Sequence, residues 1–284
     1  MITGLDHIIV LTRDLNTSVA AYSAFLGRTP AWRGGEGDTV HAWFQLGNMA
    51  LDVVQPGADA AMMRKRLAAS GEGLFALGFA TPDLAEARGI LVRRGVSMAE
   101  PRITTSTAAD GAVRTWTSAT ASWRTTAGLS MFLVANDGAP PVLSPAIGDA
   151  AGAVSALDHV VVNTPNPDRA LGLYGAKLGL DLRLDRSNAD WGSRLLFFRC
   201  GAAVVEVSAS LKAPVSDEPD RLGGLAWRVD DADAAQARIA AAGLDVSEVR
   251  TGRKPGTRVF TVRSGVPGGV PTLMIQQNAE GVAA

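Results

Sequence analysis

The chain has 284 residues, 47% of them hydrophobic and 19% charged, with a formal net charge of −1. This length predicts two domains, and the near-neutral charge argues against a nucleic-acid surface. No apolar run reaches the ~18 residues of a membrane helix. Cys200 is the single cysteine, so no internal disulfide forms, which fits a reducing compartment. Without a signal peptide before the first predicted strand, we expect a cytoplasmic protein that is a monomer or a homodimer.

A β-α-β-β-β unit is predicted at the start of the chain. Residues 5–12 form its first strand, because four apolar residues follow His7, as in a strand that is covered on both faces. Asp14 then caps a helix with apolar residues at helical spacing, and Gly27 ends it. The other strands of this unit are predicted at residues 31–33, 41–46 and 50–55, with turns at 34–38 and 47–48.

A second unit of the same kind follows a connecting helix at residues 62–69. Asp83 and Glu86 form a capping box at the start of its helix, and Gly95 ends that helix. The remaining segments of this unit are predicted strands at residues 74–80, 113–123 and 129–135 and a small, polar loop at 106–111.

The whole pattern then begins again. A segment rich in Pro, Gly and Ala opens at residue 136, so we predict a first domain at 1–136, a linker at 137–153 and a second domain at 154–284. Adding 152 to seven positions of the first unit gives identical residues. The seven repeated residues are Leu157, Asp158, His159, Thr164, Tyr174, Leu178 and Gly179. The predicted segments of the second domain are strands at 195–199 and 203–208, a strand and helix at 225–243, and closing strands at 258–262 and 272–276.

The fold predicted from this repeat is α+β. Four βαβββ units form two tandem domains, and their mixed sheets form concave half-barrels. A concave cup of this kind is a common place for a small-molecule ligand.

The arrangement resembles the vicinal oxygen chelate superfamily, which contains glyoxalases, extradiol dioxygenases and bleomycin-resistance proteins. The resemblance covers nearly the whole chain and is closest to two-domain glyoxalase-like members. It rests on the strands Leu5-Asp6-His7-Ile8 and Leu157-Asp158-His159-Val160, the helix ends Phe25-Leu26-Gly27 and Lys177-Leu178-Gly179, and the strands Ala50-Leu51-Asp52-Val53-Val54 and Val204-Val205-Glu206-Val207.

The resemblance implies a metal site. In that superfamily, a histidine of the first strand and an acidic residue of the fourth strand bind the metal. The matching residues here are His7 and Asp52 in the first unit and His159 and Glu206 in the third. Imidazole and carboxylate suit Fe, Mn, Ni, Co or Zn, so one divalent metal ion is the expected cofactor and no organic cofactor is expected.

Two further ligand positions of the family pattern are empty in each domain. They align with residues that cannot bind a metal, namely Ala76, Phe132, Gly224 and Leu273. A cup made from one domain would therefore hold a metal through only two protein ligands, one fewer than a catalytic zinc site usually has.

One arrangement would restore the metal site. If the first unit faced the third, a two-histidine, two-carboxylate centre would form from His7, Asp52, His159 and Glu206. The alternative is that each carboxylate is buried beside its histidine and hydrogen-bonded to it without metal.

Residues outside this set are weaker candidates. His41 shares a strand face with Trp43 and Gln45, so it is a candidate general base beside a cup; the alternative is a surface residue at a strand end. We see no Ser-His-Asp order and no cysteine nucleophile.

Three functions are compatible with these residues. The first is a metal-dependent lyase or isomerase of the glyoxalase kind, acting on a small oxygen-rich carbonyl or diol, with Glu206 or His41 moving the proton. The second is a metal-free protein that binds or sequesters a small molecule. The third is an extradiol-type ring-cleaving dioxygenase, which is less favoured because neither domain supplies a second histidine ligand.

Overall fold

A computed structural model of the chain describes residues 1–135 and 142–277. The first half contains, in chain order, β1 (Gly4–Leu11), α1 (Leu15–Leu26), β2 (Trp32–Glu36), β3 (Thr39–Gln45), β4 (Ala50–Gln55), α2 (Ala61–Ser70), β5 (Gly73–Ala80), α3 (Leu84–Arg93), β6 (Arg102–Thr107), β7 (Val113–Thr120) and β8 (Ser130–Ala135). The second half contains η1 (Ala150–Gly152), β9 (Val154–Asn163), α4 (Pro167–Ala170), the π-helix η2 (Leu171–Lys177), β10 (Asp181–Asn188), β11 (Ser193–Cys200), β12 (Ala203–Ser210), β13 (Arg221–Val229), α5 (Ala232–Ala241), β14 (Asp245–Val246), β15 (Arg250–Thr251), β16 (Thr257–Ser264), η3 (Pro267–Gly269) and β17 (Thr272–Gln277).

Helices α1 and α3 begin at the capping aspartates that the sequence predicts, and α1 ends at the predicted Gly27. The Asp14 carboxylate accepts a hydrogen bond from Thr17 N at 2.6 Å, and Gly27 ends α1 in the left-handed conformation with φ 66°. Asp83 caps α3 in the same way, and Asp231 caps α5. These caps satisfy backbone N–H groups that have no partner inside the helix.

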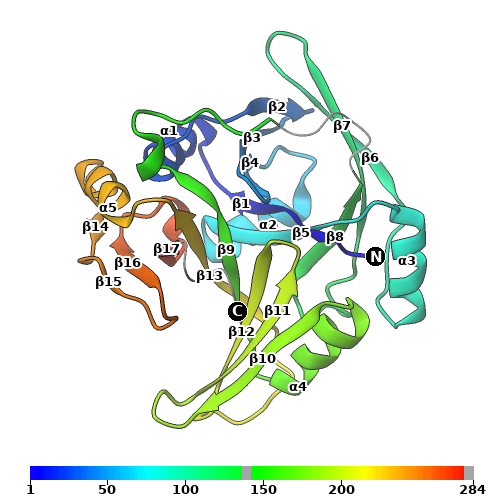
Figure 1. The fold of residues 1–284 in the computed structure, drawn as a ribbon. Helices are drawn as coiled ribbons and strands as arrows, with labels where there is room; N and C mark the ends of the chain where they lie inside the picture. The colour runs from blue at the N-terminus through cyan, green and yellow to red at the C-terminus, as the bar shows by residue number, and fades with distance from the viewer. Residues whose placement is uncertain (136–141, 278–284) are drawn as a thin grey trace.

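The strands form two sheets, one from each half of the chain (Figure 1). The first closes into a barrel with the order β1-β4-β3-β2-β6-β7-β8-β5. The second has the order β10-β11-β12-β9-β13-β17-β16-β14, and within the described residues its two edges do not pair. The predicted α+β class and the repeated units are confirmed, but only the second sheet is an open half-barrel.

Two predicted loops contain strand. The β2 strand continues to Glu36 across the expected turn, and β6 ends at Thr107, inside the expected loop at residues 106–111. Strands β2 and β6 are both polar, so they lack the apolar alternation from which a strand is predicted. Threonine in β6 favours a strand because it is β-branched.

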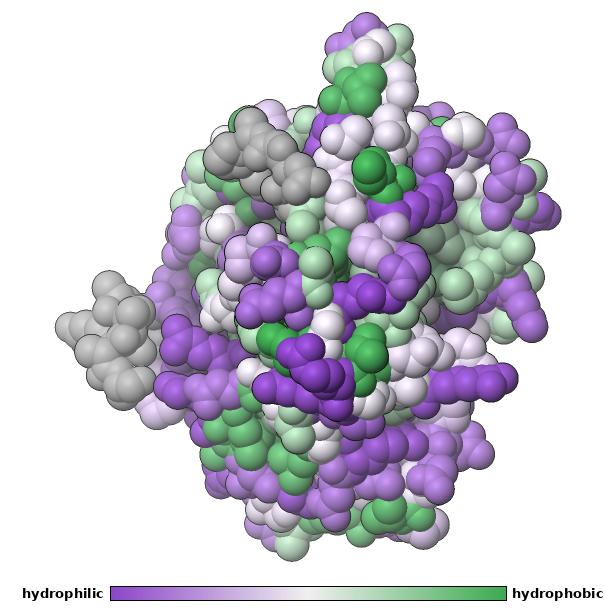
Figure 2. All heavy atoms as spheres, turned by 90° about the vertical axis from the view of Figure 1, so that its right-hand side faces the viewer, coloured by the Kyte–Doolittle hydropathy of each residue, from purple (hydrophilic) through white to green (hydrophobic). Residues whose placement is uncertain are grey.

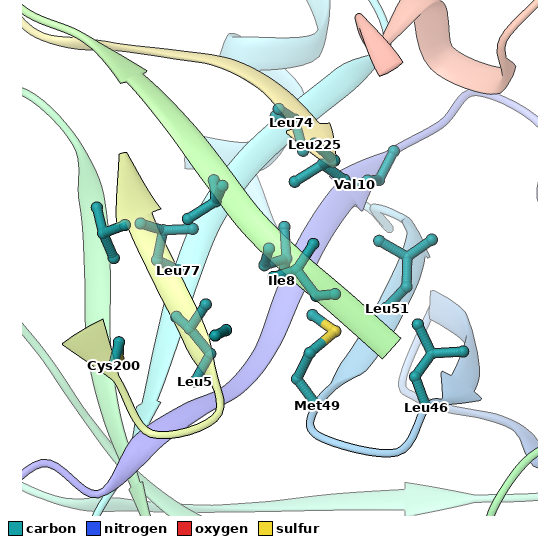
Figure 3. Close-up of a cluster of buried hydrophobic side chains, with 14 of the residues drawn as sticks. Leu5, Ile8, Val10, Leu46, Met49, Leu51, Leu74, Leu77, Cys200 and Leu225 are labelled. Carbon is teal, nitrogen blue, oxygen red and sulfur yellow. The ribbon is translucent and has the colours of Figure 1, made fainter. Parts of the chain in front are cut away.

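Both sheets pack against one shared hydrophobic core. Figure 3 shows β9 crossing β1, with Leu5 and Val10 of the first half in the same buried cluster as Cys200 and Leu225 of the second. The same cluster contains Val160 of β9. Because the two halves bury apolar surface against each other, each stabilises the other.

The predicted domain limits at 136/137 and 153/154 stay a prediction. Residues 136–141, where the linker was expected to open, lie outside the described residues. The segment after them runs along the first half, where Thr29 N donates to Pro145 O and Ile147 N donates to Gly27 O.

Figure 2 shows one side of the molecule, where hydrophobic residues lie in small separate groups among polar ones. In the part of the chain that the structure describes, no helix is both long enough and apolar enough to span a membrane.

Asn48 provides a test of how the halves are joined. Its side-chain amide donates to Leu157 O at 2.8 Å, and its carbonyl accepts from Leu157 N at 2.9 Å. The Asn48→Ala change leaves both backbone groups of β9 without this partner, so we expect the free energy of unfolding to fall by about 2 kcal/mol. Urea denaturation measures it, with the exposed Asn16→Ala as control, and an equal effect of the two changes would contradict this role.

Candidate functional site

A β-bulge shapes both copies of the repeated strand. In the pairing of β1 with β5, Leu5 and His7 lie opposite adjacent residues, so Asp6 is the extra residue. The pairing of β9 with β13 skips Asp158 in the same way. A bulge turns two successive side chains to one side, and each aspartate therefore lies beside the histidine that follows it.

The resulting Asp–His contacts are short. His7 Nδ1 lies 2.6 Å from Asp6 Oδ1, and His159 Nδ1 lies 2.9 Å from Asp158 Oδ1. A carboxylate that accepts the Nδ1 proton fixes the tautomer and leaves Nε2 available for other chemistry. The two copies differ in what surrounds that Nε2 atom.

In the first barrel, aromatic rings enclose His7. Its side chain is only 2% exposed, and its ring lies 4.6 Å from the Trp43 ring and 5.1 Å from the Phe132 ring. Phe132 also lies directly over Gly78, where a Cβ atom would come within 2.7 Å of the phenyl ring. The family ligand position is thus filled by an apolar side chain.

Asp52 has a different partner from the one expected. Its Oδ1 atom lies 2.7 Å from His41 Nδ1, and His41 Nε2 lies 2.7 Å from Ser106 Oγ. Ser106 Oγ also accepts a hydrogen bond from Trp32 Nε1. His41 and Asp52 are 6% and 4% exposed and Ser106 is 1% exposed, so the expectation of a surface His41 is wrong.

This chain of hydrogen bonds has the residue types of a Ser-His-Asp triad, but its position indicates a structural role. It crosses the seam where Gly35 of β2 pairs with Thr107 of β6, and a Cβ atom at Gly34 would come within 2.5 Å of Ser106 Oγ. A nucleophile needs space beside it for the reacting carbon, and this serine is packed against backbone.

A partly buried arginine lies against two of the tryptophan rings of the first barrel. The Arg114 guanidinium lies 4.8 Å from the Trp43 ring centre and 5.6 Å from that of Trp32. Burial lowers the pKa of Arg114, and the charges of Asp52 and Asp6 oppose this shift. The first barrel is therefore filled by its own charged and aromatic side chains.

In the second sheet, the histidine faces a carboxylate. His159 Nε2 lies 3.4 Å from Glu206 Oε2, and the two side chains are 15% and 17% exposed. Burial raises the pKa of Glu206, and the charges of His159 and Arg253 oppose this. A carboxyl group whose pKa lies closer to neutrality is better suited to exchange a proton.

Asp158 is held by several donors besides His159. Arg228 Nε donates to its Oδ2 at 2.9 Å, and Gln277 Nε2 donates to the same atom at 3.0 Å. Burial alone would raise the pKa of Asp158, but the hydrogen bonds from His159 and Arg228 outweigh it and bring the pKa to about 2. The carboxylate stays ionised and keeps the His159 ring oriented.

Two loops meet across the open side of the second sheet. The Arg253 guanidinium, from the loop before β16, lies 4.0 Å from the ring centre of Trp191, which belongs to the turn between β10 and β11. Arg186 lies 5.8 Å from the same ring. Arg253 also influences Glu206, so a cationic and aromatic rim borders the His159–Glu206 pair.

The four predicted metal ligands do not come together. Strand β1 pairs with β4 and β5, and β9 pairs with β12 and β13, so the units pair as one with two and three with four. The arrangement in which the first unit faces the third is therefore corrected. Across residues 1–135 and 142–277, no group of three or more His, Cys, Asp or Glu side chains is placed to hold a metal ion.

The donor set of the second sheet is also short of a family-type metal centre. His159 lies opposite Ala226 on β13, and Ala226 lies opposite Leu273 on β17. Neither neighbour has a ligand atom. The His159–Glu206 pair supplies two donors, so these residues alone do not fit a metal bound by three protein ligands.

Known protein families match both halves of the chain. The family described as "Glyoxalase-like domain" matches residues 5–151, and the "Glyoxalase/Bleomycin resistance protein/Dioxygenase superfamily" matches residues 158–261. The chain belongs to the glyoxalase-like, vicinal oxygen chelate superfamily. Both predicted resemblance and tandem organisation are thereby confirmed. The comparison with curated proteins gave no match.

Solved structures share the glyoxalase-like fold at low identity. A 4-hydroxymandelate synthase variant from Streptomyces coelicolor is 17% identical, with a TM-score of 0.71, covering 98% of this chain and 94% of that one. A Mn(II)-bound glyoxalase from Novosphingobium aromaticivorans is 16% identical, with a TM-score of 0.65 and coverage of 97% and 82%. An extradiol ring-cleaving dioxygenase from B. fuscum is 14% identical, with a TM-score of 0.62 and coverage of 98% and 72%. Mn(II) is named for that glyoxalase alone, and the divalent metal ion expected for this chain stays a prediction.

Several site residues were missed by the sequence reading. Asp6 and Asp158 were seen only as part of a motif, although the three-residue spacing of Leu5 and Ile8, both in the core, is a sign of a bulge. Nothing in the sequence pairs Ser106 with His41, because that contact joins strands of different units.

The His41–Asp52 pair gives a pH-dependent prediction. Burial lowers the pKa of His41, but the charge and hydrogen bond of Asp52 outweigh burial and raise it overall. Protonation of His41 therefore stabilises the fold fully below the unfolded value near 6.5, and this stabilisation is lost as pH rises through the raised folded value.

In Asp52→Asn, burial and the Arg114 charge remain while the raising causes disappear, so we expect the pKa of His41 to fall below 6.5. NMR titration of the imidazole resonances measures this, with the His41 signal assigned by its loss in His41→Gln. The exposed Asp38→Asn is the control. An unchanged pKa in Asp52→Asn would contradict the pairing.

Proposed function

We propose that the second half carries the functional centre, on the concave face around His159 and Glu206. The observation that carries the proposal is the Asp158–His159–Glu206 chain of contacts on an open sheet. The matching site of the first half is enclosed by rings and closed into a barrel. The second half is therefore the better candidate for a ligand that enters from solvent.

The ligand class that we propose is a small oxygen-rich carbonyl or diol compound. Arg253 offers a guanidinium near Glu206 that can bind a carbonyl, hydroxyl or carboxylate oxygen, and Trp191 offers a ring against its carbon skeleton. His159 Nε2 faces the same space, because Asp158 holds Nδ1 on the other side of the ring.

The reaction that we propose is lyase or isomerase chemistry by proton transfer. Glu206 removes a proton from carbon beside the carbonyl, and the Arg253 charge stabilises the negative charge that develops on oxygen. His159 then exchanges a proton with that oxygen. All of these groups belong to the second half, so His41, predicted as a catalytic base, takes no part.

Two other candidates follow from specific observations. A metal-free binding or sequestering protein is favoured by the short donor set, because Ala226 and Leu273 stand beside His159. A metal-dependent version is the weaker candidate, because the His159–Glu206 pair supplies only two donors at family positions.

Proton exchange tests the proposed chemistry. In deuterated buffer, the wild type is expected to speed the loss of the carbon-bound proton from small α-hydroxycarbonyl compounds, beginning with dihydroxyacetone, as followed by proton NMR. Glu206→Gln removes the base, so the rate is expected to fall by about 100-fold or more. The matched change in the first half, Asp52→Asn, is expected to leave the rate unchanged. Exchange that persists in Glu206→Gln would contradict the role of this carboxylate.

Metal content separates the remaining candidates. Protein purified without chelators is analysed for Fe, Mn, Ni, Co and Zn. The metal-dependent version requires about one equivalent per chain, lost in both His159→Ala and Glu206→Ala but kept in Asp52→Asn. A chain that binds the carbonyl probes but exchanges no proton and takes up no metal would instead be a binding protein.

A further inference from the structure

A groove between the two halves lies outside the site described above. It has a volume of about 490 Å³. One wall is the loop that follows β7, and the other is formed by α4, η2 and the segment before β13. The groove is lined by, among others, Trp123, Arg124, Ala127, Arg169, Lys177 and Asp217.

The groove is rich in positive charge. Arg124, Arg169 and Lys177 line it against one carboxylate, Asp217. Trp123 is 57% exposed at the same wall, and the Arg124 guanidinium lies 5.4 Å from its ring centre. An exposed ring beside several cations is suited to a flat, anionic ligand.

A buried polar cluster anchors one of the three cations. Arg169 Nη2 donates to Asp220 Oδ1 at 2.7 Å, and the Asp220 side chain is fully buried. Asp220 Oδ2, Arg169 Nε and Tyr174 Oη are buried and make no hydrogen bond to any other part of the described chain. Burial raises the pKa of Tyr174 well above its ordinary value, and the Asp220 charge adds to this.

Groups of this kind are costly in a protein interior. A buried polar atom without a partner destabilises the fold by about 1–3 kcal/mol. Buried polar atoms of this kind call for an explanation, and their place behind a cationic groove is compatible with a binding function.

The backbone around the groove is also irregular on both walls. Ala127 has φ 54°, the left-handed conformation that an alanine rarely adopts, and its carbonyl accepts from Asp220 N at 2.8 Å. On the opposite wall, Leu171–Lys177 is a π-helix. Strained residues and π-helical turns occur often at ligand sites.

We propose that this groove is a second ligand site, for a small anionic molecule that carries a flat ring. Arg124 and Lys177 bind the carboxylate or phosphate group, Arg169 lines the same groove as the ion-pair partner of Asp220, and Trp123 stacks on the ring. The site does not include His159 or Glu206, so its test does not depend on the proposed proton-transfer chemistry.

Titration with defined probes tests the site. Benzoate and phenyl phosphate carry the two possible anionic groups on the same ring. Neutral benzamide has the ring without the charge, and inorganic phosphate has the charge without the ring. The readout is the indole N–H signals in a nitrogen-15 NMR spectrum, with the Trp123 signal assigned from Trp123→Phe and the Trp191 signal from Trp191→Phe. We expect the Trp123 signal to move with at least one ring-bearing anion and much less with benzamide.

Matched variants decide the outcome. Arg124→Gln with Lys177→Gln is expected to weaken binding by at least about tenfold, because two charge-assisted contacts are lost. Arg93→Gln with Lys65→Gln removes the same charges from exposed helix positions and is expected to leave binding unchanged. The proposal is overturned if no probe moves the Trp123 signal, if both double variants weaken binding equally, or if only the Trp191 signal moves.

Discussion

The bulge at Asp6 and Asp158 determines how each repeated strand is used. Leu5 and Ile8 of β1 must both reach the shared core, although three positions separate them along the chain. A regular strand would turn them to opposite faces. One extra residue restores the match and leaves an aspartate and a histidine together on the other face. The same packing requirement that joins the two halves therefore creates an oriented imidazole in each.

The two copies then diverge through their surroundings. In the first, Asp52 is hydrogen-bonded to His41, and His41 and Trp32 are both hydrogen-bonded to Ser106. These bonds connect β2 and β3 to β6, where the barrel closes. In the second, Glu206 is one methylene longer and approaches His159 itself. In the first copy, aromatic rings and the partly buried Arg114 guanidinium take the space around His7 that a ligand would need.

Much of this could be predicted from the sequence, because the evidence was local or repeated. The repeat of 152 residues gave the four units, and the caps gave the helices. Barrel closure was not predictable, since it depends on one backbone pair and a few side-chain contacts between β2 and β6, two polar edges without apolar alternation. The partner of Asp52 was not predictable either, because His7 and His41 are both within one strand of it and only the direction of each side chain distinguishes them. The sequence also shows that four family ligand positions cannot bind a metal, namely Ala76, Phe132, Gly224 and Leu273. The observed strand pairing then limits each sheet to the donors of its own half.

That constraint places a specific demand on the second half. In the proposed centre only two donors reach the ligand, so the charges that the protein already holds in place would supply most of the chemistry. Asp158 keeps a full negative charge and fixes His159, while burial moves Glu206 in the opposite direction, toward holding its proton. Two neighbouring carboxyl groups with opposite shifts can take different parts in one reaction. Arg253 of the facing loop adds a positive charge near Glu206. In the proposed reaction this charge would stabilise the substrate oxygen on which negative charge develops. The outer surface of the closed first barrel packs against β9 in the shared core and so supports the strand that carries His159.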